Sequence, residues 1–253
     1  MVTTASVKRA VVIGGSRGFG AALARHLADA AWDVVATGRR ADAELPAAVR
    51  YVRGDLAHVD GLAAVASVLE QAEPHLVVFN AASYGAIGAP PEHSDMQQVF
   101  RVNAIAPYYL LRQHLTTRLS DQFCSCVVIN SDAIYHAAES SAVYAASKAA
   151  LRVLTSALAS VCRARPASVS TLLLGPLADD RKIDELHAIA TRRGVADEEI
   201  IRTFLRRSNP SFVTDQLIDL DSCIRSVEYL AALGRAANGM QCRLDGGSAG
   251  SLV

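Results

Sequence analysis

The architecture of the chain follows from residues 11–23, which read VVIGGSRGFGAAL. An apolar run leads into three spaced glycines, and an amphipathic segment follows, so the order that we predict is strand, turn and helix. This is the context that a dinucleotide-binding loop requires. In such a loop Gly14 allows the tight turn, Gly18 lets backbone approach a pyrophosphate, and Gly20 lets the helix lie close to the strand. The alternative is a flexible glycine turn without a ligand.

The second apolar run, residues 33–37, ends at Gly38 and is followed by Arg39 and Arg40. In dinucleotide folds an acidic side chain at this strand end accepts a hydrogen bond from the ribose 2′-hydroxyl of NAD, whereas an arginine accommodates the 2′-phosphate of NADP. Because Gly38 takes the acidic position and Arg17 can add a second positive charge, the sequence favours NADP(H). The alternative is that Arg39 and Arg40 are solvated surface residues.

Apolar runs and helical patterns alternate along the whole chain. The expected strands are residues 9–13, 33–37, 49–53, 75–79, 126–130 and 169–174, and residues 239–247 are expected to form a final strand and turn. The expected helices are residues 21–28, 58–71, 92–119, 141–164 and 220–233. This alternation predicts an α/β fold, a Rossmann-type doubly wound parallel sheet of about seven strands with helices on both faces. Residues 1–253 are expected to form one domain, and Pro107 is expected to kink the long helix.

Residues 179–210 differ from this pattern. They are charged and helically periodic, with breaks at Gly194 and at Asn209–Pro210. They follow the carboxyl end of a strand, where open α/β sheets bind their ligands. We interpret them as a small helical lid over a substrate, with an additional structural helix pair as the alternative.

Composition limits the possible partners. The 253 residues are 51% hydrophobic and carry no formal net charge, which gives no electrostatic reason to expect nucleic acid or a membrane surface as a partner. No apolar run approaches the roughly 20 residues of a membrane span, and residues 1–9 do not resemble a signal peptide. The five scattered cysteines favour reduced thiols over a metal site, so we expect no metal and a cytoplasmic location.

Tyr144 and Lys148 are spaced to lie on one face of a helix. A lysine ammonium beside a phenol favours the phenolate, so the pKa of Tyr144 is expected to fall below the usual value of roughly 10. A tyrosine of this kind can exchange protons near neutral pH. Lys148 is also one of only three lysines in a chain that otherwise uses arginine, which suggests a role that a guanidinium fills less well. The alternative is a solvated lysine near a half-buried tyrosine.

Together these segments resemble the short-chain dehydrogenase/reductase family, in its short single-domain branch. The resemblance runs from Val11 to Gly247 and lies in the order and spacing of the motifs. The matching positions are the glycine loop (Gly14, Gly18, Gly20), Asp55–Leu56, the segment Asn80-Ala81-Ala82-Ser83, Asn103, Ser131, Tyr144 with Lys148, and the closing Asp245-Gly246-Gly247.

The resemblance implies a hydride-transfer mechanism. Tyr144 would exchange the proton with the substrate oxygen, Ser131 would hydrogen-bond that oxygen, Lys148 would bind the nicotinamide ribose, and Asn103 would support a proton-relay water. The implied cofactor-binding residues are Gly14, Ser16, Arg17, Gly18, Phe19, Gly20, Arg39, Asp55, Leu56, Asn80, Ala81, Ala82, Tyr144, Lys148, Pro176 and Leu177. The substrate residues expected are Ser83, Tyr84, Asp132, Ile134 and Tyr135, within pocket walls formed by residues 84–87, 134–140 and 179–210. Family members usually form dimers or tetramers, so a homo-oligomer such as a homotetramer is expected.

Four positions depart from the family pattern. Ile13 replaces a threonine, Ala81 replaces an asparagine, and Gly175–Pro176 reverses the usual Pro-Gly order after the sixth strand. Asp132 follows Ser131 where a small or neutral residue is usual. Asp132 could tune the site, bind a polar substrate or simply stabilise a turn, and His136 nearby is expected at the surface.

The leading hypothesis is therefore an NADPH-dependent oxidoreductase that reduces a ketone of a small molecule to an alcohol, or catalyses the reverse reaction. An imine or enone reductase or a dehydratase on the same fold is one alternative. The other is a non-catalytic NADP(H)-binding sensor or partner protein, against which the presence of Ser131, Tyr144, Lys148 and Asn103 counts.

Overall fold

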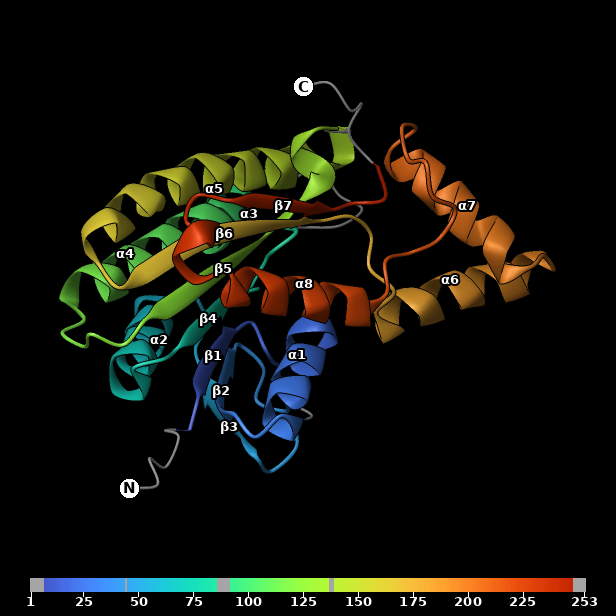
Figure 1. The fold of residues 1–253 in the computed structure, drawn as a ribbon. Helices are drawn as coiled ribbons and strands as arrows, with labels where there is room; N and C mark the ends of the chain where they lie inside the picture. The colour runs from blue at the N-terminus through green and yellow to red at the C-terminus, as the bar shows by residue number, and fades with distance from the viewer. Residues whose placement is uncertain (1–6, 44, 86–91, 137–138, 248–253) are drawn as a thin grey trace.

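The computed structural model describes residues 7–43, 45–85, 92–136 and 139–247. Its centre is a parallel sheet of seven strands in the order β3-β2-β1-β4-β5-β6-β7 (Figure 1). The strands are β1 (Arg9–Ile13), β2 (Asp33–Gly38), β3 (Val49–Arg53), β4 (Leu76–Phe79), β5 (Cys124–Ser131), β6 (Ala167–Leu174) and β7 (Gln241–Leu244). The prediction of a doubly wound, Rossmann-type sheet is confirmed. The chain order reverses between β1 and β4, which are neighbours, so the carboxyl ends of these strands flank the switch point where such sheets bind ligands.

Helices cover both faces of the sheet because the central strands are apolar on both sides. One face packs on α2 (Val59–Ala72), α4 (Ala106–Thr117) and α5 (Ala142–Val161), and the other on α1 (Gly18–Asp29) and α8 (Leu220–Ala232) (Figure 1). Residues Glu139–Ala164 are long and apolar enough, by length and composition, to cross a membrane. They contain α5, however, which is a helix of the core: Leu151 and Leu158 are buried against the sheet.

The long helix expected over residues 92–119 is instead three segments. α3 (His93–Phe100) leads into one π-helical turn (Arg101–Ile105), and α4 continues from Ala106. The cause lies in Pro107, which has no N–H to donate to the carbonyl four residues earlier, that of Asn103. The wider turn places Asn103 in the core at the point where the regular helix is interrupted.

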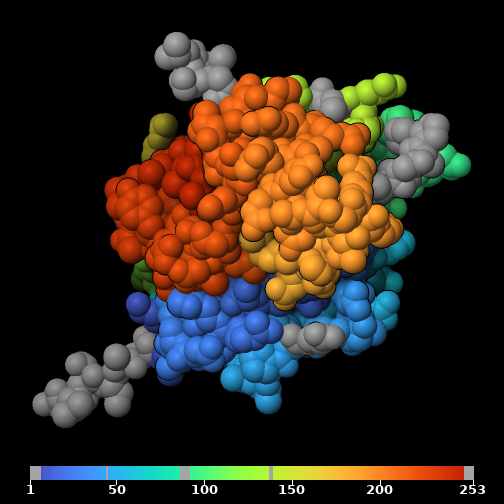
Figure 2. Space-filling model, turned by 90° about the vertical axis from the view of Figure 1, so that its right-hand side faces the viewer, coloured from blue at the N-terminus to red at the C-terminus, as the bar shows by residue number. Residues whose placement is uncertain are grey.

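Residues 179–210 form two helices beside the sheet layers, α6 (Asp180–Arg193) and α7 (Asp197–Ser208). Figure 2 shows them, in orange, covering one face of the molecule. α6 ends at Gly194, which has a φ of 65° that glycine adopts without strain. The two helices share a small core around Leu186, Ala190 and Ile200, so they support each other as a pair.

Candidate active site

The glycine loop between β1 and α1 is tightly packed against the end of β4. A side-chain carbon on Gly14 would lie 2.4 Å from the Ala81 nitrogen, and one on Gly20 would lie 2.2 Å from the Gly14 oxygen. Asn80 fastens the loop by donating from Nδ2 to the Gly14 carbonyl at 2.9 Å. Gly18 is different, because its φ is +52° and a side chain there would make only ordinary contacts. Only the side chain of Asp179 lies near the position that a side chain on Gly18 would take, at the N-terminus of α1.

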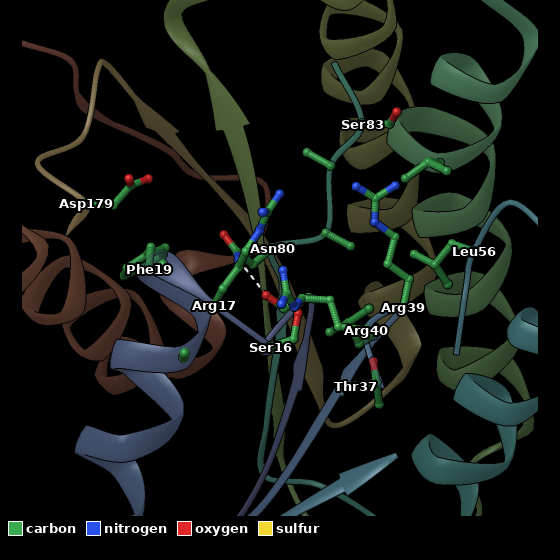
Figure 3. A pocket seen from close by; sticks show the side chains of 18 of the residues that line it. Ser16, Arg17, Phe19, Thr37, Arg39, Arg40, Leu56, Asn80, Ser83 and Asp179 are labelled. Carbon is green, nitrogen blue, oxygen red and sulfur yellow. Dashed lines mark hydrogen bonds between the residues drawn. The ribbon is translucent and has the colours of Figure 1, made fainter. Parts of the chain in front are cut away.

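A cavity of about 640 Å³ opens over this loop (Figure 3). The predicted cofactor residues that line it are Gly14, Ser16, Arg17, Gly18, Phe19, Arg39, Asp55, Leu56, Asn80, Ala81, Ala82 and Leu177. Gly20 lies behind the loop, and Pro176 lines a second cavity instead. Thr37 and Asp179 also line this wall and were not predicted to do so. Asp179 precedes α6, and its proximity to Gly18 could not be read from the sequence.

The residues of this cavity fit a dinucleotide. The hydroxyl of Thr37 is fully buried and has no partner among the described residues, so it can serve a bound ribose or phosphate. Arg40 is paired with Asp42, but Arg17 and Arg39 form no ion pair with any residue that the structure describes. Two cations that line the cavity, Arg17 at the start of α1 and Arg39 after β2, are therefore left to face an anionic ligand.

Lys148 lies in the core between α5 and the end of β5. Only 3% of its surface is exposed, and its Nζ donates to the Ile129 carbonyl at 3.0 Å. Burial lowers the pKa of its ammonium to about 8. Lys148 Nζ is 5.9 Å from the centre of the Tyr144 ring, which is close enough for attraction between the cation and the ring.

The expectation that Lys148 lowers the pKa of Tyr144 is wrong for this structure. Burial of the phenol raises that pKa well above its usual value, and the neighbouring Tyr84 raises it further. Ser131 opposes them by lowering the pKa through its interaction with the Tyr144 hydroxyl. A neutral phenol beside a serine hydroxyl is a proton donor at neutral pH.

Ser131 is positioned by the residue before it, Asn130, which the sequence analysis left without a role. Asn130 accepts a hydrogen bond from the Ser131 N–H at 2.8 Å and donates to the Lys148 carbonyl at 3.1 Å. It therefore ties the end of β5 to the helix that carries Tyr144. The signal in the sequence was a single amide at the end of an otherwise apolar strand.

Asn103 joins three segments at this site. Its Oδ1 accepts from the Ser83 N–H, and its Nδ2 donates to the Ser83 carbonyl, both at 2.7 Å. Nδ2 also donates to the Ser147 hydroxyl at 3.0 Å, and that hydroxyl donates to the Tyr144 carbonyl at 2.7 Å. The side chain of Asn103 thus holds the loop after β4 against α5.

A second cavity, of about 580 Å³, lies between the catalytic candidates and the helices α6 and α7. Tyr84, Asp132, Tyr144 and Pro176 line one side of it, and residues of α6 and α7 line the other. Asp132 accepts a hydrogen bond from the Ser131 hydroxyl at 3.2 Å. His136 also lines this cavity.

The other predicted substrate residues have different positions. Ser83 lines the first cavity, and Ile134 and Tyr135 line neither. The Tyr135 ring lies 5.0 Å from the Arg243 guanidinium and 5.6 Å from that of Arg152. Residues 86, 87, 137 and 138 of the predicted pocket walls lie outside the described residues.

The short chain dehydrogenase family model matches residues 8–184, which include the glycine loop, Ser131, Tyr144 and Lys148. The chain belongs to this family. One relative, the "Uncharacterized oxidoreductase YvaG" of Bacillus subtilis (strain 168), is 24% identical over 257 residues, 95% of each chain. A solved "short chain dehydrogenase/reductase family protein" is 25% identical, with a TM-score of 0.76 over 95% of this chain and 96% of its own. The L-sorbose reductase of Gluconobacter frateurii has the same fold, with a TM-score of 0.81 over 98% of each chain at 18% identity.

The reversed Gly175–Pro176 of this short-chain dehydrogenase is held from two sides. Gly175 N–H donates to the Leu244 carbonyl at 3.1 Å, and the Pro176 carbonyl accepts from Ile218 N–H at 2.9 Å. A side chain on Gly175 would lie 3.0 Å from the Asp245 oxygen, so glycine suits this close approach to the end of β7. Proline is thereby placed where its missing N–H leaves no backbone donor for a ligand.

Proposed function

We propose that this short-chain dehydrogenase is an NADP(H)-dependent oxidoreductase that reduces a ketone of a small molecule to an alcohol, or oxidises the alcohol. The observation that carries the proposal is that Ser131, at the carboxyl end of β5, interacts with the hydroxyl of Tyr144, which lines the second cavity one helical turn before Lys148 on α5. The nicotinamide, when bound, would supply or accept the hydride.

In this proposal Tyr144 donates a proton to the substrate oxygen, and Ser131 donates a hydrogen bond to the same atom. The phenol of Tyr144, whose pKa burial raises, is protonated at neutral pH and so has a proton to give in the reductive direction. Lys148 would bind the nicotinamide ribose hydroxyls, and its lowered pKa leaves the ammonium able to release a proton near pH 8. Asn103 would support the water that relays this proton.

The choice of NADP(H) over NAD(H) rests on Arg17 and Arg39, which line the cavity and pair with no acidic residue in the part of the chain that the structure describes, and on Gly38 at the end of β2. Solved structures of the same fold contain either cofactor: the L-sorbose reductase contains NADPH and a 4-hydroxyisoleucine dehydrogenase contains NADH. The arginines of this chain support NADP(H) because they can pair with the 2′-phosphate.

Members of this family act on small molecules, and the second cavity is the proposed substrate site. Residues 179–210 are the proposed lid, within a single domain of residues 1–253. A second candidate function, imine reduction, is supported by Asp132, whose carboxylate lines that cavity beside Ser131 and could stabilise a cationic nitrogen. A non-catalytic NADP(H)-binding role has no comparable observation in its support.

We also propose a homo-oligomer in the cytoplasm. Large apolar side chains are exposed on the helices that cover one face, at Ile105, Tyr109 and Val153. Ile105 and Tyr109 lie one helical turn apart, and exposed apolar side chains on these helices would suit a contact surface with a second copy of the chain.

The test is an assay of the purified protein with a panel of ketones, cyclic imines and enones, using NADPH and NADH separately. We expect NADPH oxidation with at least one ketone and faster turnover than with NADH. Mass spectrometry of the product distinguishes C=O from C=N or C=C reduction. Equal rates with NADH would contradict the argument from Arg17 and Arg39, and cofactor binding without any turnover would favour the binding-protein alternative.

A further inference from the structure

Tyr84 is the one residue that lines both cavities among those that the structure describes. Its ring is stacked on that of Tyr144, with centroids 4.6 Å apart and planes inclined by 21°. The side of Tyr84 away from Tyr144 is open, since 58% of the residue is exposed. An exposed aromatic ring stacked on the candidate acid is placed where cofactor and substrate would meet.

The backbone just before Tyr84 is held in place by hydrogen bonds. The preceding residue, Ser83, is held at both its N–H and its carbonyl by Asn103. Through Ser147 the same asparagine reaches the carbonyl of Tyr144. One buried amide therefore links the backbones that carry the two stacked rings, and the stack is built into the fold rather than made by chance contact of two mobile side chains.

The stacked arrangement also brings a second polar group to the Tyr144 hydroxyl. Ser131 and Tyr84 both interact with that hydroxyl, and their effects on its pKa are opposite: Ser131 lowers it and Tyr84 raises it. Asp132 raises it as well. The other titratable groups that line the cavity or face the phenol are Lys148, His136, Glu185, Arg193 and Arg207.

We propose that Tyr84 is a positioning residue of the acid/base centre, whose ring fixes the plane of the Tyr144 phenol and whose hydroxyl is the second polar partner of the Tyr144 hydroxyl, after Ser131. The inference rests on the proposed function for its catalytic consequence. The interaction between Tyr84 and Tyr144 can be tested without a substrate. In the reaction, substrate oxygen would replace Tyr84 as the partner of the phenol, while the stacked ring keeps the phenol aimed at Ser131.

The substrate-free test is an NMR titration of protein labelled with ¹³Cζ-tyrosine, which gives signals from seven tyrosines. Tyr144→Phe identifies the Tyr144 signal. Tyr84→Phe keeps the stack and removes the hydroxyl, and Tyr229→Phe, at an exposed position of α8, is the matched control. We expect the Tyr144 midpoint to fall by about one pH unit in Tyr84→Phe, a tenfold change in the acid constant, and to stay unchanged in Tyr229→Phe. Equal Tyr144 midpoints in these two variants would overturn the proposal.

The kinetic test uses a ketone that the wild-type protein reduces. We expect Tyr84→Leu, which removes the stack, to lower kcat about tenfold and to leave the KM of the ketone unchanged. We expect Tyr84→Phe, which keeps the stack, to have the kcat of the wild type, with the pH dependence of kcat shifted to lower pH. A higher KM with unchanged kcat would mean that Tyr84 only contacts substrate, and would contradict a positioning role. If Tyr84→Leu does not fold, the titration of Tyr84→Phe decides. If no ketone is reduced by the wild type, the proposed function fails, and the titration still tests the pair.

Discussion

Replacing Lys148 with methionine is expected to remove activity. At neutral pH it should also remove the loss of unfolding free energy that comes from burying the charged ammonium. The ammonium is buried, and its pKa in the folded protein is about 8 against 10.5 for an ordinary lysine. Because the folded pKa is the lower one, the unfolded chain binds the proton more tightly between these values. The wild-type protein therefore gains stability as the pH rises from 8 toward 10.5, and below pH 8 it bears the full cost of burying the charge.

The size of the effect follows from the shift. A lowering from 10.5 to about 8 corresponds to about 3 kcal/mol. Methionine does not titrate, so the difference in unfolding free energy between Lys148→Met and the wild type should decrease by about 2 kcal/mol between pH 7 and pH 9.5. Loss of the hydrogen bond to the Ile129 carbonyl costs about 1–2 kcal/mol at either pH and leaves this trend unchanged.

Urea unfolding of both proteins at several pH values measures this difference. Lys8→Met is the matched control, because Lys8 is an exposed lysine outside the core. A difference for Lys148→Met that stays flat, or that grows with pH, would refute the reasoning. It would mean that the buried lysine is already neutral at pH 7 or that it is solvated in the folded protein.

Three further substitutions test other parts of the site. Asn103→Ala should lower the unfolding free energy by about 2–4 kcal/mol, because Ser83 loses both of its buried partners, while Gln97→Ala on the exposed side of α3 should change it little in the same urea titration. Gly20→Ala places a carbon 2.2 Å from the Gly14 backbone oxygen and should lower the free energy of unfolding by about 3 kcal/mol in thermal unfolding. Gly194→Ala meets no atom within 4 Å and should lower it by only about 1 kcal/mol, because alanine adopts a positive φ less readily. Arg39→Ala should weaken NADPH binding about tenfold in calorimetry and leave NADH binding unchanged; equal losses for both would contradict a 2′-phosphate contact.

Much of the fold was predictable because its signals are local. The strands of the sheet other than β3 and β7 correspond to largely apolar runs, and the glycine loop has its own spacing. The long helix over residues 92–119 was predicted wrongly in detail, since the sequence shows the proline but not the π-helical turn that accommodates it. That turn is a tertiary response that puts Asn103 against Ser83 and Ser147.

The site was predictable where residues match family motifs and unpredictable where it depends on side chains meeting across the fold. The direction of the Tyr144 pKa required knowledge of how deeply the phenol is buried and of Tyr84 beside it. Tyr135 was expected near substrate because it lies between Ser131 and Tyr144 in the chain. Its ring instead contacts the guanidinium groups of Arg243 and Arg152. Sequence spacing gives the segment on which such a residue lies, and packing decides which way its side chain points.

The central claim, that Tyr144 is the acid/base of a hydride transfer, is tested most directly by Tyr144→Phe. The variant is assayed for NADPH binding by calorimetry and for ketone reduction by NADPH oxidation, with Tyr229→Phe as the control. We predict cofactor binding close to that of the wild type and a kcat lower by a factor on the order of 10²–10⁴. Wild-type turnover in Tyr144→Phe, with the Tyr229→Phe control also active, would contradict the account.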